Sequence, residues 1–280
     1  MRSPGPPAEV RRTLAENRAR ASSLIEEAAS TKGHTVERLT SKVVLIEQGA
    51  TTIAFTGMLG PSIGHAIQLF CDSLALPRLR WSQAGLPIAD FRLVARSDAE
   101  EGRSAIRDFD EVAMVGSVVP GAGHSHLASH VAEDMFEKVW RQVASQTGSG
   151  RLHSRVLVEP VPRGRDLRVT MVAGEVAQVT EVVPPAFNQR PWTPGSLGDH
   201  AQSHVALDPG PRELVASAWK ELPQIAYCTI HMEVDHTGAK LRHVELEPEL
   251  SSMASGATRE RLLQAIIDLE FVRAGHSGST

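Results

Sequence analysis

The chain has 280 residues, of which 41% are hydrophobic and 22% charged, which suits a globular protein of one large domain or of two to three interlocked subdomains. Its formal net charge of -4 gives no reason to expect nucleic acid or an anionic membrane as a partner. No apolar run approaches the roughly 20 residues that a bilayer requires, and the first residues lack the apolar core of a signal peptide. The two cysteines, Cys71 and Cys228, suit a reduced compartment, so we expect a cytoplasmic protein.

The first 70 residues predict a helix followed by a hairpin. Residues 8–31 are rich in Ala, Leu and Glu, and Gly33 is expected to end this helix. Two β-branched runs, at 43–46 and 51–56, are separated by a short turn and predict two paired strands. We expect this region, 1–70, to precede the main body of the protein.

The next stretch, 71–150, predicts alternating helices and strands. A helix that starts at residue 65 should break near Pro77, because proline cannot donate a helix hydrogen bond. The joint at 147–150 is rich in Gly and Ser and is expected to separate two subdomains. The other elements expected here are an extended segment at 91–94, a helix at 97–107, a strand at 112–115, a loop at 120–126 and a helix at 129–146.

The final stretch, 151–280, predicts strands joined by tight turns. A long polar segment at 184–211 is expected to be a functional loop, because long loops are uncommon in compact domains. The mixture of helices and hairpins in both halves favours the α+β class. The remaining elements expected are strands at 156–161 and after the 162–166 turn, a helix at 212–222, hairpin strands at 227–234 and 240–246, and a helix at 258–274.

Three motifs, in this order and spacing, resemble those of ATP-grasp enzymes. Cys71-Asp72 is followed by a helix and by Ala84-Gly-Leu-Pro87; residues 157–169 read Leu-Val-Glu-Pro-Val-Pro-Arg-Gly-Arg-Asp-Leu-Arg-Val; and residues 244–250 read Val-Glu-Leu-Glu-Pro-Glu-Leu. The likeness extends from about residue 20 to residue 272 and is strongest to the ligase domain of cyanophycin synthetase and related amino-acid and peptide ligases. It implies an ATP-grasp-like α+β fold, with subdomains at 71–150 and 151–280 enclosing a cleft.

The resemblance also implies an activity and its cofactors. ATP and Mg²⁺ would be used to form an amide or peptide bond through an acyl phosphate, and the substrate would be an amino acid or small peptide. Arg168 would contact the transferred phosphate, because its fork of donors suits phosphate oxygens. The alternative for Arg168 is a salt bridge to Glu245 or Glu247. Backbone groups at Glu159 and Val161 would contact adenine.

A metal site is expected on the strand that carries Glu245 and Glu247. Residues two apart in a strand point to one face, and clustered carboxylates are ligands that Mg²⁺ accepts. The resemblance places a third ligand in the preceding strand, where spacing favours Glu233 and the apolar pattern favours His231; we place Glu233 first. The alternative is a solvated strand face.

Two loops complete the site that the resemblance implies. Gly121 and Gly123 belong to a glycine-rich segment that would cover the phosphates, next to His124 and His126. In the long polar loop, Asn188 and Arg190 would contact the substrate.

The chain departs from the family at two lysines that grip the nucleotide phosphates. Ser73 and Val115 stand at these positions, and the whole chain has only five lysines. The alternative function is therefore a degenerate ATP-grasp protein that serves as a binding module or as the inactive partner of an active ligase. A homodimer and a partner ligase both remain open.

Overall fold

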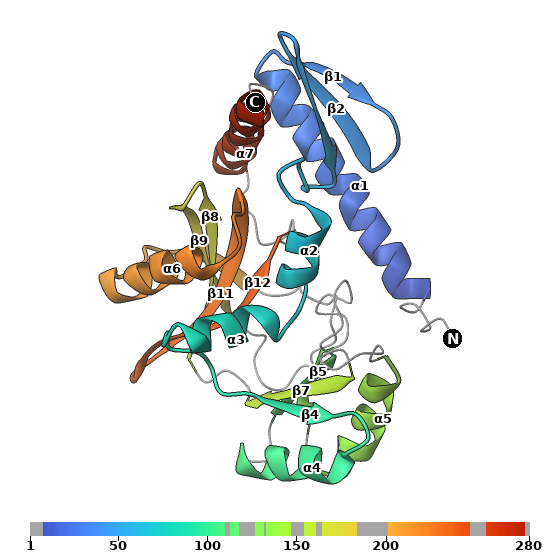
Figure 1. Ribbon diagram of the computed structural model, residues 1–280, viewed down its shortest axis with the longest axis vertical. Helices are drawn as coiled ribbons and strands as arrows, with labels where there is room; N and C mark the ends of the chain where they lie inside the picture. The colour runs from blue at the N-terminus through green and yellow to red at the C-terminus, as the bar shows by residue number, and fades with distance from the viewer. Residues whose placement is uncertain are drawn as a thin grey trace.

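The computed structural model describes residues 8–109, 113–117, 127–131, 133–146, 154–160, 164–183, 201–246 and 256–277. Helices and sheets form three parts that follow one another along the long axis of the molecule (Figure 1). One end holds α1 (Ala8–Thr31), α7 (Ala257–Ser277) and a three-stranded sheet. A five-stranded sheet fills the middle, and a four-stranded sheet with two helices forms the other end. This mixture of helices and antiparallel sheets confirms the α+β class.

The end that carries the N-terminal helix has its own apolar core. Its sheet has the order β1 (Thr35–Arg38), β2 (Val43–Gln48) and β3 (Thr51–Thr56), all antiparallel. Ile25 of α1, Phe55 of β3 and Ile267 of α7 are fully buried in this core. The predicted first helix, hairpin and closing helix are confirmed, while β1 was not expected.

Two short helices, α2 (His65–Cys71) and α3 (Leu76–Gln83), replace the single broken helix that the sequence predicts. The break lies before Pro77, which occupies the first turn of α3, where its missing N–H is not needed. Trp81 of α3 is fully buried, and its Nε1 donates to the carbonyl of Ala218, 3.0 Å away. This bond fixes α3 against α6 (Pro209–Glu221).

The middle sheet contains the hairpin predicted at 227–246 and the strand predicted after the 162–166 turn. The strand predicted at 156–161 pairs in the four-stranded sheet instead. The strand order of the middle sheet is β10-β9-β8-β11-β12, and every neighbouring pair is antiparallel. One face packs apolar side chains against α3 and α6. The bounds are β8 (Arg165–Val172), β9 (Glu175–Val183), β10 (Ala201–His204), α6 (Pro209–Glu221), β11 (Tyr227–Asp235) and β12 (Gly238–Glu245). The predicted loop at 184–211 is therefore interrupted by β10, and α6 begins before it ends.

The four-stranded sheet has the order β4-β7-β5-β6. Its bounds are β4 (Arg92–Ala95), β5 (Ala113–Ser117), β6 (Leu127–Val131) and β7 (Arg155–Pro160), and it is covered by α4 (Ala99–Asp108) and α5 (Phe136–Gln146). The predicted helix at 129–146 is wrong in its first part, because Val131 pairs with Ala113 in the sheet. A single helical turn at Glu133–Met135 and then α5 follow that strand. Sheet pairing outweighed the local helical pattern at these positions.

The chain passes from one sheet to the other between Pro160 and Arg165. Strand β7 pairs with β4 and β5, whereas β8 pairs with β9 and β11. Helix α3 lies at this junction: Leu74 and Ala75, before its first turn, share a small core with Leu157 of β7, while Trp81 belongs to the core of the middle sheet. The predicted subdomain boundary at residue 150 remains a prediction, and β7 belongs to the sheet that precedes the junction.

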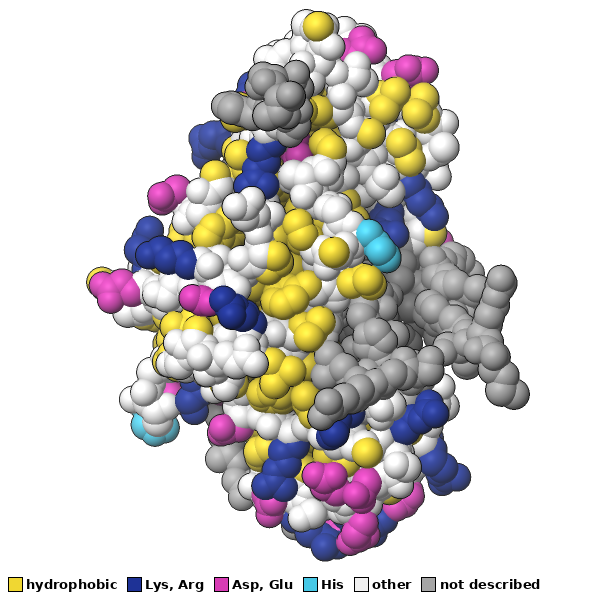
Figure 2. All heavy atoms as spheres, in the orientation of Figure 1, with side chains coloured by type: hydrophobic (Ala, Val, Ile, Leu, Met, Phe, Trp, Pro, Cys, Tyr) yellow, Lys and Arg dark blue, Asp and Glu magenta, His cyan; other side chains and the backbone are white. Residues whose placement is uncertain are grey.

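The face of the molecule seen in Figure 2 carries hydrophobic side chains near its centre, in the region of α2 and α3. Charged side chains are concentrated toward the lower end and the left side of the same view. Helix α2 contributes Leu69, which is 39% exposed. Among the described residues, no helix combines the length and the apolar character that crossing a membrane would require.

Candidate functional site

One face of the five-stranded sheet carries the polar side chains that the sequence predicts for a site. His231 alternates along β11 with Ile230 and Met232, which belong to the apolar core on the opposite face. Arg168 of β8 is the ladder partner of His231 and therefore shares its face. Both side chains are buried. This polar face is the candidate site.

Glu245 contacts His231 on the polar face. His231 Nε2 lies 3.1 Å from Glu245 Oε2, and the His243 ring stacks on the His231 ring with centroids 3.9 Å apart. Burial, and after it the charge of Arg168, lowers the pKa of His231 to about 3. The imidazole is therefore neutral at pH 7, and its Nε2–H donates to the carboxylate. Of the two residues left open by the sequence, His231 rather than Glu233 lies beside Glu245.

A β-bulge places Arg242 on this face as well. Arg242 is the extra residue between the His231–His243 pair and the Met232–Leu241 pair. With strict alternation, Arg242 would point into the apolar core on the other side of the sheet. The bulge instead lets Leu241 enter the core and turns the guanidinium toward the candidate site.

Glu233, the residue placed first as the third metal ligand, is held by protein groups. Its Oε2 lies 3.3 Å from Arg242 Nη1, and its Oε1 accepts the backbone N–H of Gly164 at 3.0 Å. A Cβ at Gly164 would come within 2.4 Å of the Val234 carbonyl oxygen, so this approach requires glycine. Among the residues that the structure describes, no three His, Cys, Asp or Glu side chains gather as a metal site would need.

Glu159, the last residue but one of β7, is only 1% exposed. Its Oε2 contacts Arg78 Nη1, and its Oε1 lies 2.8 Å from Arg242 Nη2. Burial raises the pKa of Glu159, but the charges of Arg242 and Arg78 outweigh it and hold the pKa below its usual value. Arg78 also donates through Nε to the carbonyl of Arg242 and lies over the Phe91 ring. We call Arg78, Glu159, Arg242 and Glu233 the junction cluster.

Neither position expected to carry a phosphate lysine supplies a positive charge. Ser73 is fully buried, and its Oγ accepts the N–H groups of Ala75 and Leu76 at the start of α3. Val115 is fully buried in the core of the four-stranded sheet with Val94 and Val158. A lysine at Val115 would bury an ammonium group in that core at a large cost in stability.

Several predicted site residues lie outside the described part of the chain. They are Gly121, Gly123, Val161, Asn188, Arg190 and Glu247, together with the two loop histidines His124 and His126. Their roles stay predictions. The described part of the site consists of Arg168, His231, Glu245 and the junction cluster.

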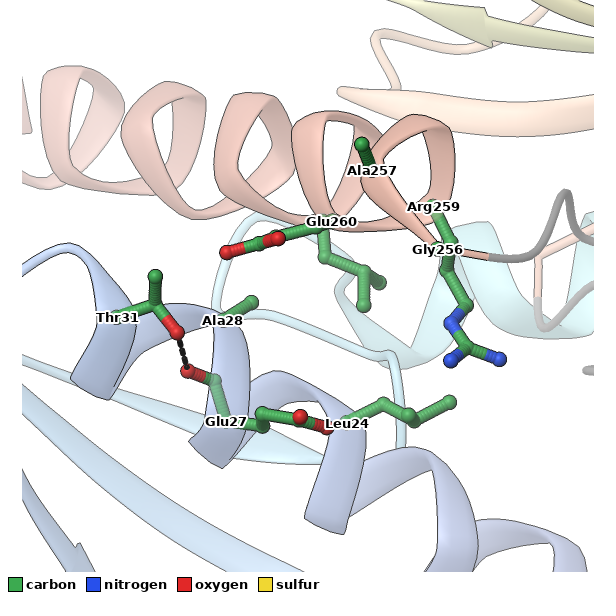
Figure 3. A pocket seen from close by; sticks show the side chains of 9 residues that line it. Leu24, Glu27, Ala28, Thr31, Gly256, Ala257, Arg259 and Glu260 are labelled. Carbon is green, nitrogen blue, oxygen red and sulfur yellow. Dashed lines mark hydrogen bonds between the residues drawn. The ribbon is translucent and has the colours of Figure 1, made fainter.

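A pocket of about 210 Å³ lies elsewhere, between α1 and the first turn of α7 (Figure 3). Its lining includes Glu27 and Thr31 of α1 and Arg259 and Glu260 of α7. In the same view, Thr31 Oγ1 donates to the backbone carbonyl of Glu27 in its own helix. None of the pocket's lining residues belongs to the polar face, so the pocket is not part of the candidate site.

Arg242 was not predicted as a site residue, although the sequence contains a signal for the bulge. Leu241 and Val244 are three residues apart, which breaks the period-two alternation of apolar residues in a strand. Arg78 lies in the first turn of α3, and no sequence motif marks it as a site residue. Its pairing with Glu159 depends on the meeting of α3 and β7, which no local pattern predicts.

Neither family models nor curated proteins match the sequence of this chain. Solved structures of ATP-grasp ligases do match its fold. D-alanyl-alanine synthetase A from Vibrio cholerae O1 biovar eltor has a TM-score of 0.60 and 12% identity, over 95% of this chain and 96% of that one. The D-alanine–D-alanine ligase from Coxiella burnetii has a TM-score of 0.56 and 18% identity, over 74% of this chain and 59% of that one.

The ATP-grasp ligase PsnB, solved with a minimal precursor, matches with a TM-score of 0.50 and 14% identity. The match covers 71% of this chain and 61% of PsnB, so this chain spans less than two thirds of that protein's length. Identities this low carry information about the fold alone. The specific likeness to cyanophycin synthetase stays a prediction. The chain has the ATP-grasp fold.

Proposed function

We propose that the protein is a carboxylate–amine ligase of the ATP-grasp type, acting on an amino acid or small peptide. The observation that carries the proposal is the polar face on which Arg168, His231 and Glu245 meet. A buried guanidinium and a carboxylate, each next to the same neutral imidazole, suit an anionic group whose charge changes during a reaction. The likeness to solved ATP-grasp ligases supports the reaction class at the level of the fold.

Each described residue has a role in this proposal. Bound ATP would supply the phosphoryl group that activates a substrate carboxylate as an acyl phosphate, with Mg²⁺ neutralising phosphate charge. Glu245 is the described carboxylate that would hold the metal, with Glu247 as its predicted companion. Arg168 would bind the activated carboxylate and stabilise the negative charge that develops when an amine attacks. The backbone of Glu159 would lie at the adenine edge.

A second candidate is a degenerate ATP-grasp protein that binds a ligand or an active partner ligase without ATP turnover. It is favoured by the burial of Ser73 and Val115 at the positions expected to hold lysines. A charge-assisted contact contributes about 1.5–3 kcal/mol, so the loss of two weakens ATP binding by roughly two to four powers of ten. The contacts of Glu233 with Arg242 and Gly164 also favour this candidate, because they occupy a carboxylate that was expected to bind the metal.

Calorimetric titration with Mg·ATP tests the proposal. The unaltered chain should bind Mg·ATP, and Glu245→Gln should abolish the magnesium-dependent part while preserving the fold, since Gln can still accept from His231. The matched control is Glu181→Gln, which removes a carboxylate of the same sheet that pairs with the half-exposed Arg165. It should leave binding unchanged.

The same titration separates the two candidates. Magnesium-dependent ATP binding, followed by ADP release when amino acids or short peptides are added, supports the ligase. Absence of ATP binding by the unaltered chain, measured with the fold intact by circular dichroism, rejects the ligase and leaves the degenerate protein. Equal binding by Glu245→Gln would remove Glu245 from the metal site.

A further inference from the structure

The junction cluster joins the two sheets through charged groups that are almost completely removed from solvent. Arg78, Glu159 and Arg242 are at most 3% exposed, and Glu233 is 9% exposed. Their charges alternate in sign along the contacts. We infer that Arg242 is a built-in cation that fastens the four-stranded sheet to the five-stranded sheet, so that both flank the candidate site as one rigid unit.

Arg242 contacts one carboxylate from each sheet. Its Nη2 lies 2.8 Å from Glu159 Oε1 of β7, and its Nη1 lies 3.3 Å from Glu233 Oε2 of β11. A planar guanidinium can serve two acceptors at once, whereas an ammonium group is a single point of charge. The link therefore depends on the shape of arginine as well as on its charge.

The cluster also connects to the backbone on both sides of the crossing between the sheets. Glu159 stands just before the crossing, and Gly164, whose N–H donates to Glu233, stands just after it. Arg78 adds α3 through its contacts with Glu159 and with the Arg242 carbonyl. The crossing is thus braced at both ends by groups that converge on Arg242.

Burial makes the link sensitive to the loss of its cation. Two buried carboxylates repel each other and lose their hydration, so each needs a positive partner. Glu159 retains Arg78 when Arg242 is removed, whereas Glu233 would lose its contact with the Arg242 guanidinium. The link depends only on the fold and on the junction cluster, whether or not the protein uses ATP.

Urea unfolding of Arg242→Met and Arg242→Lys gives the first test. Removal of one partner from a buried ion pair should raise the unfolding equilibrium constant by about two to three powers of ten in Arg242→Met. The matched control is Arg165→Met, which breaks the more exposed Arg165–Glu181 pair, and a change of about fivefold or less is expected there. Equal, small effects in both methionine variants would overturn the inference.

The hydrogen-exchange rate of the Gly164 amide tests the link locally, because this N–H donates to Glu233. In Arg242→Lys, which retains a charge but cannot serve both carboxylates, Glu233 should be held less firmly and the Gly164 amide should exchange faster. Millimolar guanidinium should restore part of the lost protection in Arg242→Met by entering the vacated space. An unchanged Gly164 exchange rate in Arg242→Lys would contradict the bracing role.

Spin labels test the rigid unit directly. Cysteines introduced at the exposed positions Glu100 in α4 and Lys220 in α6 report the distance between the two sheets' outer helices. The distribution of label distances should be narrow in the otherwise unaltered chain and broader when Arg242→Lys is added. A distribution that is equally broad, or equally narrow, in both proteins would overturn the inference even if Arg242→Met fails to fold.

Discussion

His231 is the residue through which pH should act on the candidate site. It is 2% exposed and is the ladder partner of Arg168, so burial and the charge of Arg168 both oppose its protonation. A neutral His231 donates to Glu245 and leaves that carboxylate with its full charge. Protonation would instead place a buried positive charge next to Arg168.

Acid should therefore weaken the fold through His231. The pKa falls from a usual value of 6.5 to about 3 in the folded chain, so the unfolded chain binds one more proton between these values. The stabilising contribution is complete above pH 6.5 and is lost as the pH falls toward 3, with a slope of up to about 1.4 kcal/mol per pH unit. In His231→Gln, this part of the slope should disappear.

Urea unfolding of the unaltered chain and His231→Gln, measured at a series of pH values from mildly alkaline to acidic, checks this expectation. The difference in unfolding free energy between the two proteins should shrink or change sign as the pH falls. A difference that does not vary with pH would show that His231 titrates alike in the folded and unfolded chain.

At the scale of elements, the bulge in the β11–β12 hairpin decides which residues face the candidate site. Both strands and their turn follow from alternation and from the Asp-His-Thr-Gly turn, and the structure confirms them. The bulge changes the face of every residue before it in β12, so Leu241 enters the core and Arg242 leaves it. The pairing of β11 with β12 and the packing against α3 therefore decide which side chains form the junction cluster. Strand propensity alone does not determine this.

The packing of α4 against α5 depends on a glycine. A Cβ at Gly102 would come within 2.4 Å of the Trp140 ring, although alanine is otherwise the better helix former. We expect Gly102→Ala to lower the unfolding free energy by about 1–3 kcal/mol, because overpacking outweighs the gain in helix propensity.

The control for this prediction is Gly275→Ala in α7. That position is exposed, and an added Cβ would meet nothing within 4 Å. This substitution should raise stability by up to about 1 kcal/mol. Urea unfolding of both variants gives the comparison; a stabilised Gly102→Ala would mean that Trp140 moves aside without cost.

At the scale of the whole molecule, Tyr227 joins the middle sheet to the N-terminal end. Its hydroxyl donates to the Met58 carbonyl at 2.5 Å and accepts the Gly60 N–H at 2.7 Å. Ser62, in the same loop, is bound by Glu270 of α7 through both its N–H and its hydroxyl. The loop between β3 and α2 is thus tied to two distant elements.

Removal of the Tyr227 hydroxyl should weaken this connection. Tyr227→Phe deprives a buried carbonyl and a buried amide of their partner, which should lower the unfolding free energy by about 1–3 kcal/mol. Ser23→Ala, which removes an exposed hydroxyl from α1, should change it by about 0.5 kcal/mol or less. Urea unfolding with hydrogen exchange at Gly60 provides the measurement, and unchanged exchange at Gly60 would count against the connection.

The sequence by itself determined the α+β class, the first and last helices, the β2–β3 and β11–β12 hairpins and the likeness to ATP-grasp enzymes. These follow from local periodicity, turn residues and short motifs. It also led to Arg168 and Glu245, because both belong to such motifs. The helix predicted at 129–146 failed in its first part because a strand partner far along the chain competed for Val131.

Only the tertiary structure decided that His231 lies beside Glu245, that Glu233 is bound by Arg242, and that Val115 belongs to an apolar core. It also decided that Arg78 and Glu159, 81 positions apart, form a buried ion pair. Each of these facts depends on which elements meet and in what register. A strand's sequence does not encode the identity of its neighbours, and a buried charge acquires its partner only when separate elements pack together.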